Sequence, residues 1–146
     1  MEKIVASVLI NRPAEAVWKF ITDWSNNPKW DKESVEMKQT STGPLGVGTT
    51  LQFRRCTFPK ISDARVIEYE PNRKFTFEGT SGPMKGLIVT MSLAAVEGKT
   101  RLTETDDYKL GGFYRLLVPF MVGTPKRNAE ARVGNVKRIL ESEAKS

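Results

Sequence analysis

The feature that most constrains the fold is a series of strand-like segments between residues 34 and 110, each separated from the next by a short turn signal. Apolar and polar residues alternate within them, as in residues 51–54, which is typical of strands with one buried face. Pro71–Asn72 and Glu97–Gly98 mark turns. Consecutive strands with such short connections predict an antiparallel meander. The expected strands cover residues 34–40, 49–56, 64–69, 74–79, 86–96 and 100–110.

Helical segments and one more strand flank this meander. Residues 2–11 predict a strand, and Pro13 opens a helix over residues 14–23, followed by a short helical turn over residues 29–32. Apolar residues at helical spacing after residue 112 predict one long C-terminal helix, interrupted near Pro119 to Pro125. Its clearest apolar stripe consists of Ala129, Val133, Val136 and Leu140. The sequence leaves open whether residues 119–125 form a gate.

These elements predict an α+β fold in a single domain spanning residues 1–146. We expect a strongly curved antiparallel sheet of six to seven strands, wrapped around the C-terminal helix. Such a sheet has more concave apolar surface than one helix, about 10 Å across, can cover, so we expect an internal cavity. Its candidate lining, for which the alternative is ordinary core packing, is Phe53, Phe75, Phe77, Met84, Met91, Phe113, Leu117, Phe120 and Met121.

The absence of certain residue types excludes several kinds of chemistry. The chain has no histidine and one cysteine, Cys56, so it cannot form a Ser-His-Asp or Cys-His catalytic site. The same deficit excludes a zinc site of histidine and cysteine ligands and an internal disulfide, and we expect no metal and no cofactor. No apolar stretch reaches the 18 or so residues of a membrane span. With no secretory signal visible, we expect a cytoplasmic protein.

The positive charge is concentrated towards the C-terminus. The net charge is +6, and the segment from Arg115 to Arg138 contains six basic residues against one acidic residue, Glu130. Such a stripe suits an anionic surface, although a solvated helix face in a basic protein has the same pattern. Because the basic residues are not interleaved with aromatic ones, we expect no nucleic-acid binding.

Three polar residues at alternating positions are the candidates for chemistry. Glu104, Asp106 and Tyr108 share one strand face with Leu102, and if Leu102 points inward they line the cavity. Two carboxylates buried together would repel, which raises the pKa of one of them. The residues between them, including Thr103, Thr105 and Asp107, would then face solvent. The opposite register buries Arg101 instead.

Further predictions concern the arginines within, and the glycines just before, the strand expected at residues 49–56. If Glu104 is not a cavity group, it forms a salt bridge to Arg55 or Arg65 at the cavity mouth. Only one of Arg54 and Arg55 can face inward, and an inward arginine would hold a ligand carboxylate. Gly46 and Gly48 are expected to allow a tight backbone path where a side chain would clash.

Five motifs, in order along almost the whole chain, carry a family resemblance. They are residues 12–18 (RPAEAVW), 23–31, 43–49 (GPLGVGT), 68–73 (EYEPNR) and 98–103 (GKTRLT). The chain resembles the helix-grip fold of the START and birch-pollen-allergen (SRPBCC) superfamily, and is most similar to its polyketide cyclase/dehydrase and lipid-transport group. The resemblance implies the fold above and a hydrophobic ligand, but it does not fix the chemistry.

Three functions remain open from the sequence. The first is a carrier or sensor that binds a small hydrophobic molecule through Phe53, Arg55, Phe75 and the other lining residues. The second is a cyclase, dehydratase or hydrolase that uses Glu104, Asp106 or Tyr108. The third is a module that docks on anionic lipid or protein through the basic C-terminal segment. Whether the chain is an enzyme and whether it forms a homodimer stay undecided at this stage.

Overall fold

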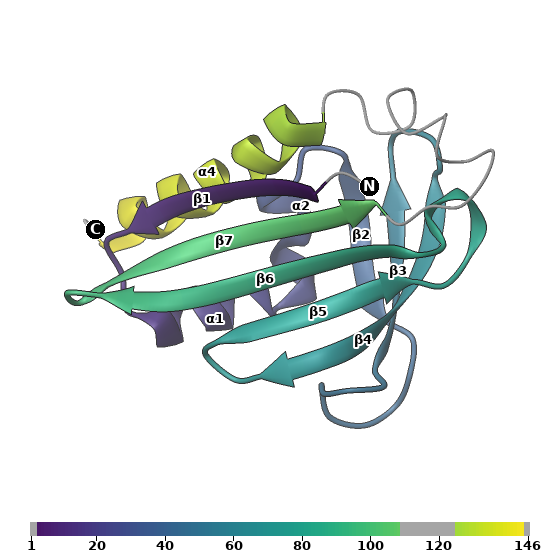
Figure 1. Cartoon of the computed structure of the whole chain (residues 1–146), viewed down its shortest axis with the longest axis horizontal. Coiled ribbons are helices and arrows are strands. Elements are labelled where there is room, and N and C mark those ends of the chain that lie inside the picture. Colours follow the sequence, from purple (N-terminus) through teal and green to yellow (C-terminus); the bar gives the residue numbers. More distant parts are fainter. Residues whose placement is uncertain (1–2, 109–124, 145–146) are drawn as a thin grey trace.

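The computed structural model of the chain describes residues 3–108 and 125–144. The first strand is followed by three short helical elements, then by six strands with one short 3₁₀ turn among them, and the chain ends in a long helix (Figure 1). The strands are β1 (Lys3–Ile10), β2 (Ser34–Gln39), β3 (Thr50–Arg55), β4 (Ile61–Glu70), β5 (Lys74–Gly79), β6 (Leu87–Val96) and β7 (Lys99–Tyr108). The helices are α1 (Ala14–Ile21), α2 (Asn27–Trp30), α4 (Pro125–Ala144) and the short 3₁₀ turns η1 (Trp24–Asn26) and η2 (Gly82–Met84).

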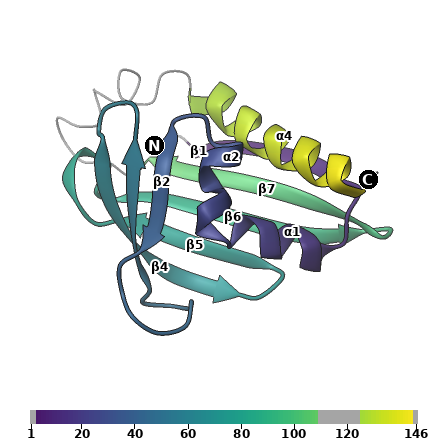
Figure 2. The same ribbon diagram turned by 180° about the vertical axis from the view of Figure 1, so that it is seen from behind.

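The seven strands form one antiparallel sheet in the order β1-β7-β6-β5-β4-β3-β2. Strands β2 to β7 therefore follow each other as a meander, and β1 pairs with β7 at the far edge. The sheet curves so strongly that β2 and β3 cross the direction of β1, β6 and β7 (Figure 1). Seen from behind, α1, α2 and α4 all lie on the concave side of the sheet (Figure 2). The predicted helix-grip architecture is confirmed.

The packed core lies between this concave face and the helices. The apolar stripe of α4 is buried as its spacing predicts, with Ala129, Val133, Val136 and Leu140 at most 3% exposed. From β1, Ile10 packs into the same cluster, together with Val17 and Ile21 of α1 and Leu102 of β7. Burial of a side chain of this size stabilises the fold by about 1.5–3 kcal/mol, so this cluster fixes where α4 crosses the sheet.

Tight turns determine the register of the meander. Glu97 and Gly98 both have positive φ (50° and 83°) between the paired residues Val96 and Lys99, the arrangement of a two-residue hairpin. At the end of β5, a Cβ on Gly79 would lie 2.1 Å from the carbonyl oxygen of Met84, so only glycine lets η2 pack there.

The prediction that a side chain at Gly46 or Gly48 would clash was wrong. A Cβ at either position meets no atom within 4 Å, so no clash requires glycine there. Gly48 instead has φ +94°, a conformation that other residues rarely adopt.

Several predicted boundaries change by a few residues. Helix α1 ends at Ile21, before Asp23, because Asp23 caps η1 through its side chain and starts a separate turn. Strand β4 begins at Ile61, three residues before its predicted start, and continues the β3–β4 hairpin. The expected interruption and gate at residues 119–125 lie outside the described residues, apart from Pro125, where α4 begins.

The solvent-facing prediction for Asp107 was also wrong, because this residue is only 8% exposed. Strand β7 is an interior strand, and Asp107 lies between Lys3 of β1 and Ile88 of β6. Within the described ranges, no helix is both long enough and apolar enough to cross a membrane.

Candidate functional site

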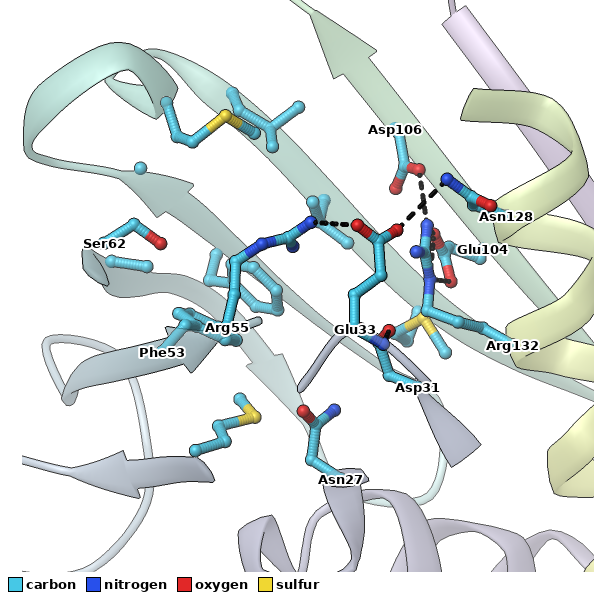
Figure 3. Close-up of a pocket in the computed structure, with 18 of the residues that line it drawn as sticks. Asn27, Asp31, Glu33, Phe53, Arg55, Ser62, Glu104, Asp106, Asn128 and Arg132 are labelled. Carbon is cyan, nitrogen blue, oxygen red and sulfur yellow. Dashed lines mark hydrogen bonds and ion pairs between the residues drawn. The ribbon is translucent and has the colours of Figure 1, made fainter. Parts of the chain in front are cut away.

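A cavity of about 120 Å³ lies between the concave sheet, the segment from α2 to β2 and the first two turns of α4. This volume is of the same order as the roughly 150 Å³ engineered cavity that accommodates benzene in another protein. The cavity is therefore large enough for one ring-sized molecule, and the side chains of Figure 3 form its wall.

The register of three neighbouring strands arranges the cavity floor in rows. Phe75, Met91 and Glu104 are aligned across β5, β6 and β7. The next row consists of Phe77, Val89 and Asp106, and Leu87 lies beside Tyr108 in the row after that. Because residues i and i+2 share a face, each row faces the cavity like the one before it. The floor thus changes from apolar on β5 and β6 to polar on β7.

Aromatic rings connect this floor to the packed core. Phe53 and Phe77 lie with ring centroids 5.3 Å apart, and Phe77 stacks on Phe75 at 6.2 Å. Phe75 in turn meets Trp18 and Trp24 edge-on, each at 5.7 Å. Contacts of this geometry add about 0.5–1.5 kcal/mol beyond the burial of the rings. The aromatic wall is therefore held by the core and does not depend on a ligand for its position.

A buried ion triad occupies the polar side of the cavity. Arg132 of α4 donates from Nε to Glu104 Oε1 at 2.9 Å, and from its terminal nitrogen to Glu104 Oε2. The same terminal nitrogen lies 3.2 Å from Asp106 Oδ2. The carboxyl groups of Glu104 and Asp106 are both almost fully buried. A single guanidinium group therefore contacts two acidic side chains in a region of low dielectric constant.

This arrangement shifts the proton affinity of Asp106. Burial, together with the adjacent Glu104 carboxylate, raises the pKa of Asp106 to about 9 despite the opposing charge of Arg132. Burial, with smaller contributions from Asp106 and Glu104, also raises the pKa of Tyr108 above its ordinary value. At neutral pH both groups therefore keep their protons, and each can donate a hydrogen bond.

A second set of polar contacts crosses the cavity near Glu33 (Figure 3). Arg55 lies 3.0 Å from Glu33 Oε2, and Thr57 donates to the same oxygen at 2.7 Å. From the other side, Asn128 of α4 donates to Glu33 Oε1 at 3.1 Å. Glu33 thereby links the β3–β4 hairpin to α4, and its contact with Arg55 neutralises that arginine.

Four buried polar atoms on the wall have no hydrogen-bond partner among the described residues. They are Asp106 Oδ1, Asn27 Oδ1, Trp30 Nε1 and Arg55 Nε. A buried polar atom left unpaired costs about 1–3 kcal/mol, so such atoms are rare in folded proteins. Their presence around one cavity indicates that the wall is suited to polar groups of a bound molecule.

The structure places most of the sequence-predicted site residues on this wall. These are Phe53, Arg55, Phe75, Phe77, Met84, Met91, Glu104, Asp106 and Tyr108. Of the two adjacent arginines, Arg55 faces the cavity and Arg54 is exposed, while Arg101 is also exposed, which excludes the alternative register of β7. Phe113, Leu117, Phe120 and Met121 lie outside the described residues. A binding role for any of these residues stays a prediction.

Two expectations for ion pairs change. Glu104 binds Arg132, and neither Arg55 nor Arg65 contacts it, because Arg65 pairs with Glu78 on the outer side of the sheet. Arg55 is not an isolated cation, because Glu33 pairs with its terminal nitrogen, but its Nε is buried without a partner among the described residues, so a role in holding a ligand carboxylate stays a prediction.

Sequence reasoning missed the helix side of the site. Asn128, Arg132 and Asn135 follow the i, i+4, i+7 spacing and form a polar strip next to the buried stripe of α4. Asn135 donates to the carbonyl of Trp30 at 3.2 Å, as Asn128 does to Glu33. The sequence contains a signal for this polar strip, because Arg132 directly precedes the core residue Val133. Arg132 also belongs to the basic segment from Arg115 to Arg138, so the sequence pattern does not distinguish it from the exposed basic residues.

Comparison with known proteins places the chain in a family. Residues 1–141 match the family model described as polyketide cyclase/dehydrase and lipid transport. The chain belongs to this family. A search of curated proteins found no match, so the family assignment comes with no curated relative.

Solved structures of similar fold agree with this assignment. The protein TTHA0849 of Thermus thermophilus is 18% identical, with a TM-score of 0.74 over 97% of this chain and 99% of its own. The Zhui aromatase/cyclase of Streptomyces sp. R1128 is 14% identical, with a TM-score of 0.73 over 98% and 95%. The Aha1 dimer subunit of Colwellia psychrerythraea is 19% identical, with a TM-score of 0.72 over 97% of both chains. At these identities the likeness concerns the fold.

Proposed function

We propose that the chain binds a small, ring-sized apolar molecule in the cavity, as a carrier or sensor. The observation that carries the proposal is the cavity of about 120 Å³, walled by Phe53, Phe75 and Phe77 and bordered by unpaired buried polar atoms. Ligand sites typically combine such an apolar wall with a few converging polar groups. Membership in a family that includes lipid transport supports the proposal.

The proposal is tested by native mass spectrometry of gently purified protein. We expect a bound small molecule in the wild type, and a reduced bound fraction or a different bound mass for Phe77→Ala. The matched control is Phe58→Ala, because Phe58 is 60% exposed and does not line the cavity. A wild-type protein that carries nothing, and that takes up no ring-sized probe on titration, would contradict the proposal.

A second candidate, a cyclase or dehydratase, is supported by the Asp106 carboxyl group. Its raised pKa keeps it protonated at neutral pH, and its unpaired Oδ1 is buried in the cavity wall. A protonated carboxyl group of this kind can give its proton to a leaving hydroxyl, which departs as water, and the carboxylate so formed can accept the α-C–H proton whose loss completes the double bond. The similarity in fold to an aromatase/cyclase motivates this candidate without establishing it.

This candidate predicts dehydration of a phenyl-substituted β-hydroxy ketone, followed by the absorbance of the conjugated enone. We expect Asp106→Asn to remove the turnover and to keep probe binding, and Glu36→Gln, an exposed carboxyl change on β2, to keep both. If Asp106→Asn turns over as fast as the wild type, Asp106 is not the acid.

The docking hypothesis for the basic C-terminal segment finds less support. Arg132 is part of the cavity wall, Lys126 donates to the carbonyl of Val5, and Lys137 donates to the carbonyl of Leu9. Three of the six basic residues thus have partners within the fold. A homodimer stays a prediction, for which a dimer of similar fold is the motive and light scattering the test.

A further inference from the structure

The charges around the cavity do not balance. Among the described residues, five carboxyl groups line it, those of Asp31, Glu33, Asp63, Glu104 and Asp106, and only two guanidinium groups, those of Arg55 and Arg132. Even with Asp106 protonated at neutral pH, the acidic groups outnumber the arginines. The protein as a whole has a net charge of +6, so the acidic excess is a local property of this site.

Both arginines are already paired with carboxylates of the fold, and Arg55 Nε is buried without a partner among the described residues. Arg132 is shared between Glu104 and Asp106, and Arg55 is bound by Glu33. A ligand carboxylate at Arg55 Nε would meet the carboxylate of Glu33 on the same guanidinium group, and one at Arg132 would have to break a buried pair. Removing one partner from a buried ion pair leaves an uncompensated charge, which is strongly unfavourable.

The rest of the wall is suited to a cation. Trp24, Trp30 and Phe53 present aromatic side chains, and the faces of such rings attract ammonium groups within about 6 Å. Asp106 Oδ1 and Asn27 Oδ1, a carboxyl and an amide oxygen, are buried without a partner among residues 3–108 and 125–144. These atoms supply the oxygen acceptors that an N–H donor requires, independently of the count of acids.

We propose that the site selects organic cations, namely protonated amines that carry a ring-sized apolar body, and that it discriminates against carboxylates of the same shape. This inference rests on the proposed ligand-binding function. The apolar body would occupy the floor formed by Phe75, Phe77 and Met91, and the ammonium group would lie towards Asp106 on β7.

Proton release is the expected companion of such binding. Asp106 is surrounded by Glu104 and Tyr108 on its own strand, Arg132 on α4 and Asp31 after α2. Its neighbours across the sheet, Ile4 on β1 and Val89 on β6, carry no charge. A cation beside this group favours its ionised form, so binding displaces the proton that Asp106 holds at neutral pH.

The test uses three probes with one phenyl body, namely phenethylamine, phenethyl alcohol and phenylacetate. Isothermal titration at pH 7 is carried out on the full chain in two buffers of different ionisation enthalpy. We expect the amine to bind at least about ten-fold more tightly than phenylacetate, with the alcohol between them and with proton release for the amine only.

Two variants separate the local charge from the overall charge. Asp106→Asn is expected to reduce the preference for the amine several-fold and to abolish proton release. Glu36→Gln removes a carboxyl group at an exposed position of β2 and should leave both unchanged. Circular dichroism confirms that each variant is folded.

The outcomes distinguish a failure of this inference from a failure of the proposed ligand-binding function. Tighter binding of phenylacetate than of phenethylamine overturns the inference and leaves the ligand-binding proposal intact. The inference is also overturned if Asp106→Asn and Glu36→Gln change the preference for phenethylamine equally. The preference would then follow the overall charge of the protein. If no probe of the three binds, the inference and the proposed binding of ring-sized molecules both fail.

Discussion

The two ends of the interior are built from the same elements but filled in opposite ways. Along the inner face of β7, Thr100 and Leu102 are fully buried at one end, and Glu104 and Asp106 are almost as buried at the other. Helix α4 repeats this change, from Val136 and Leu140 in the packed core to Asn128 and Arg132 at the cavity. Burial along β7 is thus similar at both ends, and what differs is the chemistry of the buried groups.

This difference shows how the fold keeps a cavity open. Apolar side chains at one end can fill the space between sheet and helix, and protein interiors tolerate few voids. At the other end the ion triad and the contacts of Glu33 hold α4 and the β3–β4 hairpin at fixed positions through directional bonds. The polar end therefore leaves a cavity where the other end is filled. Apolar burial at the packed end stabilises the fold that contains this cavity.

The largest expected effect comes from breaking the ion triad at the polar end. Arg132→Met leaves Glu104 buried and uncompensated, so we expect a loss of about 3–5 kcal/mol in the free energy of unfolding. Urea denaturation measures this loss. Arg138→Met, an exposed change on the same helix, is the control and should cost less than about 0.5 kcal/mol.

The double variant Arg132→Met with Glu104→Gln sharpens this test. Removing the charge of Glu104 as well should restore part of the lost stability, since no buried ion is then left unpaired. Equal stability of Arg132→Met and Arg138→Met would show that the triad does not hold the polar end together.

A pair of truncations compares the two ends directly. Leu102→Ala at the packed end should cost about 2–5 kcal/mol and leave probe affinity unchanged, because Leu102 does not line the cavity. Phe77→Ala, which removes a half-buried ring of the wall, should cost less stability and alter probe affinity several-fold. Denaturant titration and a fluorescent probe report the two quantities. The opposite assignment of effects would mean that the cavity wall is ordinary core.

The last expected effect concerns pH. The folded-state pKa of Asp106, about 9, lies above its ordinary value of 3.8, so this group makes the protein less stable as pH rises between these values. Asp106→Asn removes that dependence. The variant should match the wild type near pH 4 and become increasingly more stable than it as pH rises towards 9, as thermal unfolding across pH would reveal. A constant difference across pH would contradict the shift.

Much of this comparison is accessible from the sequence, and the reasons are local. Alternation and turn signals identify the meander, and the i, i+2 pattern places Glu104, Asp106 and Tyr108 on one face of their strand. The structure shows that this face is the cavity face. Strand geometry fixes which residues share a face, but the pattern alone leaves open which of the two faces is buried.

The partners of these groups could not be derived in the same way. That Glu104 binds Arg132, and that Glu33 joins Arg55 to Asn128, depends on where α4 crosses the sheet and on how α2 leads into β2. Asp107 shows the same limit, because it is buried although Arg101 on the same face of β7 is exposed, so the strand pattern alone does not give its burial. Tertiary position, which no local spacing encodes, decides both.

The most direct test of the account is an amide chemical-shift titration of isotope-labelled protein with phenethyl alcohol, a neutral ring-sized probe. The account predicts saturable shifts at cavity residues such as Phe53, Phe77 and Val89, and none around Val17 and Leu140. Shifts confined to the packed end, or no saturable shifts, would contradict the central claim that the polar end of the interior is a binding site.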